Sequence, residues 1–319
     1  MSCVVISGVA GFLGSTLARQ LIEDFQVIGV DNFSPYYDKF LKVENLSSLR
    51  GKRNFQFFES GLADLKRTIP ERSIDCFFHF AAQPGVRQSW GEGFEQYAID
   101  NVLGTQQALE FCISRKIPQF VYSSSSSIYG AVPLAPTTEE TPARPISPYG
   151  VSKYAGESLA AAYSAEHGVK VRSLRYFTVF GRGQRPDMAI NKLIAALISE
   201  KPFYLYGNGN QSRDFTHVDD VVQANLLAYL KPQVHMNEVF NVGGGNSVTM
   251  LDLIDTLEEV TKKKLQLIAS DRIVGDVPST MASFVRIRET LGWMPKVKLE
   301  DGLRDQFEWQ AKFSKEKGV

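Results

Sequence analysis

The stretch Ser7–Gly14, which reads SGVAGFLG, decides how the N-terminal half of this 319-residue chain folds. Its three glycines are spaced three residues apart, directly after the apolar run Val4–Ser7 and at the start of a helical pattern. Glycine suits these positions because the backbone must turn sharply and pass close to another group, where a Cβ atom would collide. A strand, a glycine-rich turn and a helix in this order predict the first unit of a parallel α/β sheet, with a helix N-terminus that can bind phosphate.

The alternation of strands and helices continues beyond this stretch. Apolar runs bounded by Gly, Asp or Ser predict strands at Val4–Ser7, Gln26–Val30, Phe55–Phe58, Cys76–Phe80, Gln119–Ser123 and Lys170–Arg175. Amphipathic segments predict helices at 16–24, 101–115, 149–167, 189–199, 218–230, 251–261 and 302–313. We therefore expect βαβ units and a parallel sheet, with the later, Gly- and Pro-richer part forming a smaller domain over the sheet edge.

Composition argues against several classes of protein. The 35 basic and 35 acidic side chains cancel, which gives no electrostatic drive toward nucleic acid. No apolar run approaches the roughly 20 residues of a membrane span, and the N-terminus lacks the pattern of a signal peptide. Three widely spaced cysteines suit reduced thiols, and four scattered histidines have no metal-ligand spacing. We expect a soluble, cytoplasmic protein that binds no nucleic acid, membrane or metal.

The end of the second predicted strand indicates which nucleotide the glycine turn binds. This strand ends VIGVD, which places Asp31 23 residues after Gly8. A carboxylate there accepts hydrogen bonds from both hydroxyls of an adenosine ribose and repels a 2′-phosphate. The sequence therefore predicts NAD rather than NADP, the alternative being that Asp31 is only a turn residue.

A tyrosine and a lysine predict an acid/base site. In SPYGVSK, Tyr149 and Lys153 lie four residues apart, on one face of a helix. A free phenol has a pKa of about 10, and a neighbouring ammonium should lower the pKa of Tyr149 enough to make it a usable proton acceptor. Such pairs are common on solvated helix faces. Here, however, the serine run Ser123–Ser127 follows a strand and supplies hydroxyls at the sheet edge where parallel sheets bind ligands.

Read in order, motifs from nearly the whole chain resemble one family. They are SGVAGFLG, VDNF, HFAAQPGVRQS, NVLGT, SSSSSIYG, SPYGVSK, RYFTVFG, RDFTHVDD, NVGGGNS, GDV and LGW. The chain resembles an extended short-chain dehydrogenase/reductase of the nucleotide-sugar epimerase/dehydratase group. The resemblance implies a Rossmann-type doubly wound parallel sheet with a smaller C-terminal α/β substrate domain, tightly held NAD and a homodimer. It implies an NAD-binding domain at 1–176, to which 215–243 return, and a UDP-sugar-binding domain made of 177–214 and 244–319.

The resemblance also implies roles for single residues. Tyr149 is the implied acid/base, Lys153 tunes it and binds the nicotinamide ribose, and Ser125, placed by counting back from Tyr129, meets the sugar 4-oxygen. The predicted cofactor-binding residues are Gly8, Gly11, Phe12, Leu13, Gly14, Asp31, Asn32, Ala81, Asn101, Tyr149 and Lys153. The predicted substrate-binding residues are Ser126, Ser127, Arg87, Thr178, Arg185, Lys192, Tyr206, Arg213 and Asp276. Among them, Arg213 matches the family's diphosphate ligand and Asp276 its uridine-ribose ligand.

The two positions after the active hydroxyl distinguish the reactions of this group. Similar 4,6-dehydratases carry an Asp-Glu pair there and uronate decarboxylases a Glu, whereas this chain carries Ser126 and Ser127. Without an acid at these positions, a 4-keto sugar has one easy fate, which is to turn over and take the hydride back on its other face. We therefore predict epimerisation at C4.

Two stretches indicate the sugar. VDNFSPYYDKFLK and RYFTVFGRGQRPDMA resemble segments of UDP-glucuronate 4-epimerases, and Thr178 stands where UDP-glucose epimerases usually carry Asn. Arg185 is suited to meet a uronate carboxylate. UDP-glucose and UDP-N-acetylglucosamine are the alternative substrates; a UDP-uronate decarboxylase and a non-catalytic NAD-binding regulator are the less favoured functions. Gly61 departs from the family's pattern, because it replaces an Asp that usually binds the adenine.

Overall fold

The computed structural model describes residues 1–132, 136–231, 235–270 and 277–318. Within them, seven strands form one large sheet in the order β10-β6-β5-β4-β1-β2-β3, and all neighbouring strands run parallel. The strands are β1 (Cys3–Ser7), β2 (Gln26–Asp31), β3 (Phe55–Glu59), β4 (Cys76–His79), β5 (Gln119–Ser125), β6 (Lys170–Tyr176) and β10 (Asn237–Val242). The predicted doubly wound parallel sheet is confirmed, and its order reverses between β1 and β4, where such sheets bind ligands.

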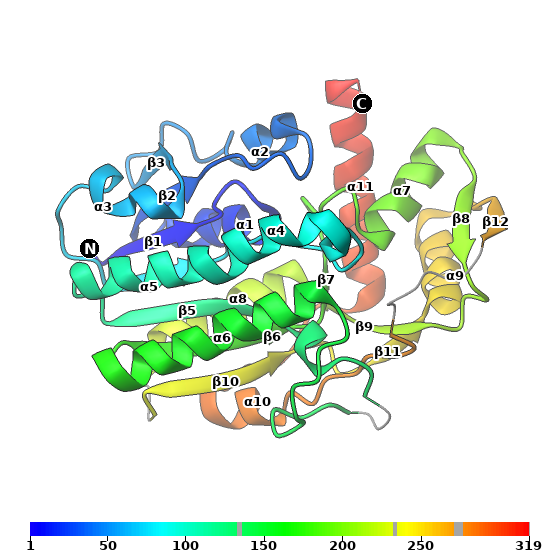
Figure 1. Ribbon diagram of the computed structural model, residues 1–319. Helices are drawn as coiled ribbons and strands as arrows, with labels where there is room; N and C mark the ends of the chain where they lie inside the picture. Colours follow the sequence, from blue (N-terminus) through cyan, green and yellow to red (C-terminus); the bar gives the residue numbers. More distant parts are fainter. Residues whose placement is uncertain (133–135, 232–234, 271–276, 319) are drawn as a thin grey trace.

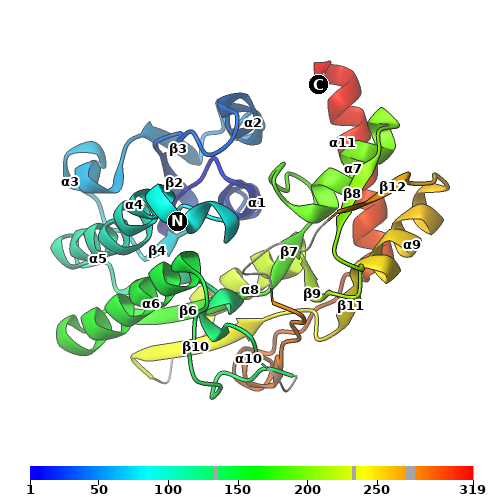
Figure 2. The same ribbon diagram turned by 45° about the vertical axis from the view of Figure 1, so that its right-hand side comes forward.

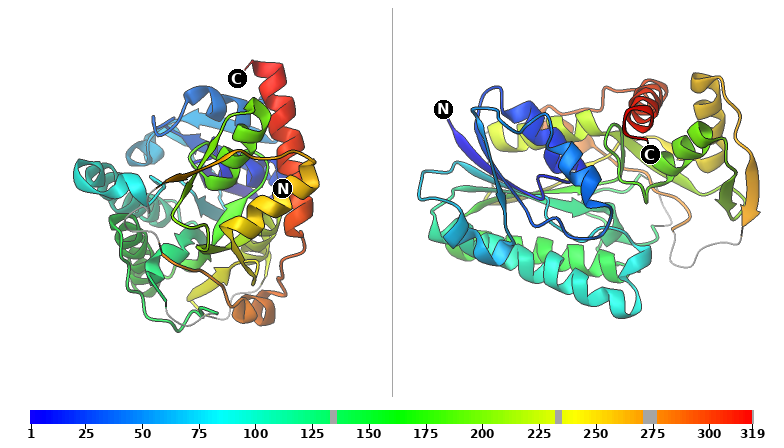
Figure 3. Two further views of the ribbon diagram at one scale, coloured as in Figure 1. Left: turned by 90° about the vertical axis from the view of Figure 1, so that its right-hand side faces the viewer. Right: turned by 90° about the horizontal axis from the view of Figure 1, so that it is seen from above.

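Helices cover both faces of this sheet (Figures 1 and 3). One face carries α1 (Phe12–Leu21), α8 (Val218–Leu230) and α10 (Val285–Leu291); the other carries α5 (Gly104–Ser114) and α6 (Pro148–His167). Alternating strand residues make both cores possible, because Val4 packs toward α1 and α8 whereas Val5 packs toward α5. Short helices complete this part: α2 (Lys39–Asn45), α3 (Leu65–Thr68), α4 (Phe94–Tyr97) and a π-helical turn at Ala98–Leu103.

A smaller α/β part lies beside the carboxyl ends of the large sheet (Figure 2). Its three-stranded sheet has the order β11-β9-β7, and β12 pairs in parallel with β8. These strands are β7 (Thr178–Phe180), β8 (Phe203–Tyr206), β9 (Ser212–His217), β11 (Ser247–Thr249) and β12 (Leu267–Ser270). The helices α7 (Ala189–Ser199), α9 (Met250–Thr261) and α11 (Leu299–Lys317) enclose a separate apolar core with them. Along the described chain, no helix is both long and apolar enough to cross a membrane.

The division into two domains stays a prediction, and the packing adds two details to it. Helix α10 carries Ile287 and Leu291 into the core beneath β10, although its residues fall in the predicted sugar domain. Residues 215–217, which were expected to return to the large sheet, still belong to β9 of the smaller sheet.

Candidate functional site

A cleft of about 780 Å³ opens at the carboxyl ends of the large sheet and is closed on its other side by β7 and α7. It brings together most of the predicted site residues, namely Gly8, Gly11, Phe12, Leu13, Gly14, Asp31, Asn32, Ala81, Arg87, Ser125, Ser126, Ser127, Tyr149, Lys153, Thr178, Arg185, Lys192 and Arg213. Two predicted residues within the described chain, Asn101 and Tyr206, are not among the residues that line it. Asp276 lies outside the described residues.

The glycine turn fits a close backbone approach. Gly8 has φ +71°, and a Cβ atom there would lie 2.7 Å from the amide nitrogen of Ala81. A Cβ atom at Gly14 would collide with the carbonyl oxygen of Gly8. Because only glycine allows this packing, α1 begins inside the cleft and presents the positive end of its dipole there.

Asp31 is held rigidly at the end of β2. Its Oδ2 accepts a hydrogen bond from the backbone of Ala10 at 3.0 Å and its Oδ1 one from Phe33 at 2.8 Å. Burial raises the pKa of Asp31, and the charge of Lys42 acts in the opposite direction. Sequence reasoning did not single out Lys42, whose buried ammonium donates to the carbonyl of Ser34 at 2.6 Å. A fixed carboxylate, a helix N-terminus and a glycine turn in one cleft fit a dinucleotide such as NAD.

Tyr149 lies in the first turn of α6, close to the end of β5. The helix begins with Pro148, and its preceding residue Ser147 accepts a hydrogen bond from the backbone of Gly150 at 3.1 Å. Burial raises the pKa of Tyr149, while a hydrogen bond with Ser125 and the charge of Arg185 lower it. Ser125 is thus hydrogen-bonded to the phenol, and its role at the sugar 4-oxygen stays a prediction.

Lys153 lies one turn further along α6, and its ammonium is 4.6 Å from the centre of the Tyr122 ring. Burial lowers the pKa of Lys153 to about 7, and the charge of Glu157 opposes this shift. The sequence led us to expect that Lys153 would lower the pKa of Tyr149. In the structure, burial outweighs the lowering contributions and the pKa of Tyr149 is raised overall, so the tuning role of Lys153 stays a prediction.

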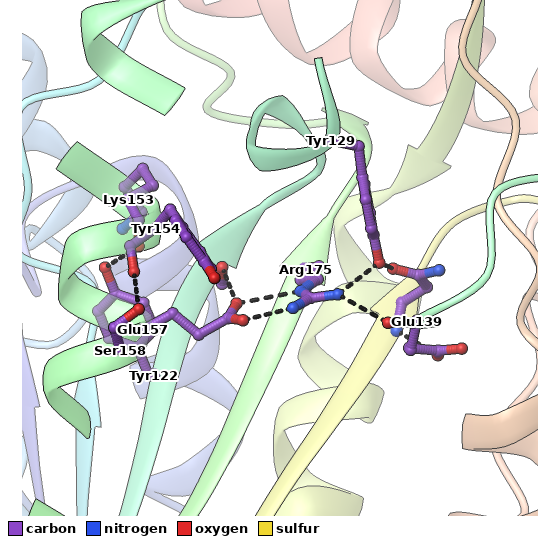
Figure 4. A network of polar contacts seen from close by, with 10 residues as sticks. Tyr122, Tyr129, Glu139, Lys153, Tyr154, Glu157, Ser158 and Arg175 are labelled. Carbon is purple, nitrogen blue, oxygen red and sulfur yellow. Dashed lines mark hydrogen bonds and ion pairs between the residues drawn. The ribbon is translucent and has the colours of Figure 1, made fainter. Parts of the chain in front are cut away.

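A buried polar network stands behind this pair (Figure 4). The guanidinium of Arg175 binds both carboxylate oxygens of Glu157, at 2.5 and 3.1 Å, and Ser124 donates to the same carboxylate at 2.6 Å. Tyr129 accepts from Arg175 at 2.8 Å and donates to Asn241 at 2.7 Å. Because Ser124 precedes Ser125 on β5 and Glu157 lies one turn after Lys153 on α6, the network fixes α6 against β5. Local sequence patterns could not reveal it, since its partners come from four separate segments.

Arg185 lines the cleft but is already paired. It forms an ion pair with Asp187 at 2.9 Å, in the loop between β7 and α7. Ser126 and Ser127 begin the short turn after β5 and Thr178 begins β7, and all three line the same cleft as Arg185. The sequence expectation did not include Asp187, although the residue lies inside the RYFTVFGRGQRPDMA stretch.

The four other predicted residues lie in different places relative to the cleft; they are Arg87, Tyr206, Arg213 and Asn101. The guanidinium of Arg87, which lines the cleft, lies 5.1 Å from the centre of the ring of Tyr206, which does not, and this contact joins the two parts of the molecule. Arg213 faces the cleft and donates to the carbonyl of Ser212 at 2.7 Å. Asn101 is buried and donates to the carbonyl of Gln83, which lines the cleft, at 3.0 Å; its predicted contact with the cofactor stays a prediction.

Comparisons with known proteins agree with this geometry. The NAD dependent epimerase/dehydratase family matches residues 4–243. The UDP-glucuronate 4-epimerase of Thermodesulfobacterium geofontis is 34% identical over 315 residues, which are 97% of this chain and 96% of that protein. An uncharacterised UDP-glucose epimerase of Bacillus subtilis is 38% identical over 307 residues, 95% of this chain and 96% of that protein. The crystal structure of the UDP-glucuronic acid 4-epimerase of Bacillus cereus with UDP-glucuronic acid and NAD superposes with a TM-score of 0.91 at 35% identity, covering 98% of this chain and 99% of that one. The chain therefore belongs to the NAD dependent epimerase/dehydratase family.

Proposed function

We propose that this protein is an NAD-dependent UDP-sugar 4-epimerase that interconverts UDP-glucuronate and UDP-galacturonate. The observation that carries the proposal is a single cleft in which Ser125 contacts Tyr149 and Arg185 lies nearby. The UDP-glucuronate 4-epimerases of Thermodesulfobacterium geofontis and Bacillus cereus support the same substrate.

In the proposed reaction, Ser125 and Tyr149 bind the 4-oxygen of the sugar. Tyr149 takes the O4 proton while hydrogen leaves C4 with its electron pair, which gives a 4-keto sugar. Bound NAD⁺ accepts this hydride and later returns it. The keto sugar turns over within the cleft, C4 receives the hydride on its other face, and Tyr149 returns the proton to O4. No atom is lost, so the overall change is an inversion at C4.

The residues after Ser125 keep the reaction an epimerisation. Ser126 and Ser127 are uncharged and line the cleft, so they supply no acid that could expel a hydroxyl or protonate C5. The carboxyl groups among the described lining residues are Asp31, Asp100 and Asp187. Asp31 accepts a backbone hydrogen bond from Ala10 at the end of β2, where we place the adenosine ribose, and Asp187 pairs with Arg185.

A uronate substrate adds the hazard of decarboxylation, because its 4-keto form is a β-keto acid. In our proposal Ser126, Ser127, Thr178 and Arg185 hold the carboxylate so that its bond to C5 lies near the plane of the C4 carbonyl. That bond then overlaps poorly with the π system and the CO₂ is retained. Fixed polar contacts can impose such a geometry without donating a proton.

The remaining assignments concern the nucleotide. We propose that Arg213 binds the diphosphate, that Lys192 and Tyr206 contact the uracil, and that Asp276 binds the uridine ribose. Arg213 and Lys192 line the cleft from β9 and α7, which supports this placement for the two of them. It also supports a division in which 1–176 with 215–243 bind NAD while 177–214 and 244–319 bind the UDP-sugar.

We further propose that the protein is a cytoplasmic homodimer whose subunits meet through α5, α6 and the π-helical turn. Exposed apolar side chains on this face support the interface: Ile99, Leu103, Val151 and Tyr154. Cys3, Cys76 and Cys112 are all free thiols, which suits a reducing compartment.

Product analysis tests the proposed activity. Purified protein is incubated with UDP-glucuronate and no added cofactor, and the nucleotide products and CO₂ are measured. We expect UDP-galacturonate with little CO₂. If UDP-pentose and CO₂ are the main products, the protein is a decarboxylase. Faster turnover of UDP-glucose would instead support the alternative suggested by the name of the Bacillus subtilis relative.

A further inference from the structure

The guanidinium of Arg185 holds a carboxylate of the protein itself. Its Nε donates to Oδ1 of Asp187 at 2.9 Å and its Nη2 to Oδ2 at 3.0 Å. Burial raises the pKa of Asp187, but the hydrogen bonds and charge of Arg185 outweigh burial, so the pKa is lowered overall. Asp187 is therefore ionised at neutral pH, and one bidentate edge of the guanidinium is occupied.

Tyr36 completes this arrangement from the other side of the cleft. Its hydroxyl donates to Oδ2 of Asp187 at 3.3 Å, and the Arg185 guanidinium lies 5.7 Å from the centre of its ring. The same hydroxyl lies against Gly85, where a Cβ atom would overlap it. We call Tyr36 and Asp187 the bracket, since together they enclose Arg185 between the loop after β2 and the loop before α7.

The loop that carries Arg185 is itself fixed. The buried side chain of Gln184 donates to the carbonyl of Val179 at 2.9 Å. Its Oε1 accepts from the backbone of Asn191 and from the side chain of Gln306, both at 2.9 Å. These contacts tie the loop to β7, α7 and α11. The direction of the guanidinium therefore depends on the bracket more than on movement of the loop.

An arginine has a second edge for a bidentate partner, formed by Nη1 and Nη2. Within the described part of the chain, Nη1 of Arg185 has no hydrogen-bond partner, and the remaining hydrogen of Nη2 meets only the weak acceptor Sδ of Met188 at 3.4 Å. We propose that Tyr36 and Asp187 are positioning residues that hold Arg185 by one edge so that its other edge meets the carboxylate of a UDP-uronate. The bracket thereby sets the preference for an acidic over a neutral UDP-sugar, an inference that rests on the proposed function.

A binding experiment separates the two sugars. In a Tyr149→Phe background, which prevents turnover, the Kd of the NAD-loaded protein is measured by calorimetry for UDP-glucuronate and for UDP-glucose. In Asp187→Asn, the guanidinium of Arg185 is no longer oriented toward the uronate carboxylate and the charge-assisted bidentate contact is weakened. We therefore expect the Kd for UDP-glucuronate to rise about tenfold and the Kd for UDP-glucose to rise less than about threefold. Tyr36→Phe keeps the ring and should produce a smaller shift in the same direction.

The chain offers a matched control. Arg182 in the same loop pairs with Asp305, and neither residue lines the cleft. Asp305→Asn removes an equivalent charge from an equivalent pair, so it should leave both Kd values unchanged. Thermal unfolding shows whether each variant is folded. If Asp187→Asn does not fold, the Kd values of Tyr36→Phe for the two sugars are compared instead.

A double-mutant cycle shows whether Asp187 acts through Arg185. In an Arg185→Gln background, Asp187→Asn should add no further loss of affinity for UDP-glucuronate. An equal loss in both backgrounds, or an equal loss for both sugars, overturns the proposal. Tighter binding of UDP-glucuronate by Asp187→Asn also overturns it, because Asp187 would then compete with the substrate. Turnover by the unmodified enzyme tests the proposed function separately, so either can fail without the other.

Discussion

At the scale of single residues, the chemistry depends on how burial acts on two ionisable groups. The pKa of Tyr149 is raised by burial and that of Lys153 is lowered to about 7. The lysine therefore releases its proton before the tyrosine does. In the proposed mechanism the active form is a phenolate beside an ammonium, which holds the same number of protons as a phenol beside an amine, so we expect the two residues to titrate as a pair.

Replacement of Tyr149 tests its role as proton acceptor. Tyr149→Phe should lower kcat by about 10²–10⁴-fold, because general acid–base catalysis contributes on this scale. NAD should stay bound, since the phenyl ring still fills its place. Tyr163→Phe is the control: it lies on the same helix, and its hydroxyl donates to Glu110 at 2.7 Å. Initial rates measure the loss of kcat, and analysis of the bound nucleotide shows whether NAD is retained. Unchanged turnover in Tyr149→Phe would remove this residue from the mechanism.

The pH dependence of kcat/KM follows from the same pair. Below the pKa of Lys153, about 7, both groups are protonated and the active form becomes rare. We therefore expect kcat/KM to be constant above this value and to fall about tenfold for each pH unit below it. Initial rates at substrate concentrations well below KM measure this. A profile that stays flat to about pH 5.5 would contradict an essential deprotonation of the pair.

At the scale of elements, local sequence patterns predict long strands and helices but not short strands or contacts between distant segments. The predicted strands and long helices are found because each repeats its apolar period over several residues. Strands β7, β9, β10, β11 and β12 were not predicted: three of them have only three or four residues, and β9 and β10 mix polar with apolar residues, so pairing with distant segments defines them. The same limit hid the network that joins β5, α6 and β6.

The buried ion pair of Arg175 and Glu157 in that network should stabilise the fold as long as both partners are present, because removing one leaves the other charge buried and unpaired. Side chains of Arg175 and Glu157 are 9% and 7% exposed. Glu157→Gln leaves a buried guanidinium without its charged partner, so we expect the free energy of unfolding to fall by about 3–5 kcal/mol. Combining Glu157→Gln with Arg175→Met should recover part of this loss.

An exposed pair supplies the comparison. Arg304 and Asp301 form an ion pair on α11 with side chains 49% and 62% exposed, so Arg304→Met should cost less than about 1 kcal/mol. Urea unfolding at neutral pH measures all four proteins. Equal costs at the buried and exposed pairs would mean that the network does not hold α6 in place.

At the scale of the whole molecule, one surface stands out as unpaired within a single subunit. Leu103 and Ile99 lie one turn apart, and Val151 and Tyr154 share a face of the neighbouring helix α6. Leu103→Glu places a charge at the centre of this surface and should convert the proposed homodimer to a monomer, as measured by sedimentation. Met294→Glu introduces the same change at an exposed apolar residue elsewhere and should leave the dimer intact. A monomeric unmodified protein would refute the interface.

The sequence by itself determined the strands from β1 to β6 and the long helices, the glycine turn, the carboxylate at Asp31 and the spacing of Tyr149 and Lys153. These features depend on spacing between near neighbours, which a linear pattern records. Only the tertiary structure decided the direction of the pKa shift at Tyr149 and the partners of Arg185, because burial and contacts such as that of Tyr36 with Asp187, 151 residues apart, arise when distant segments pack together.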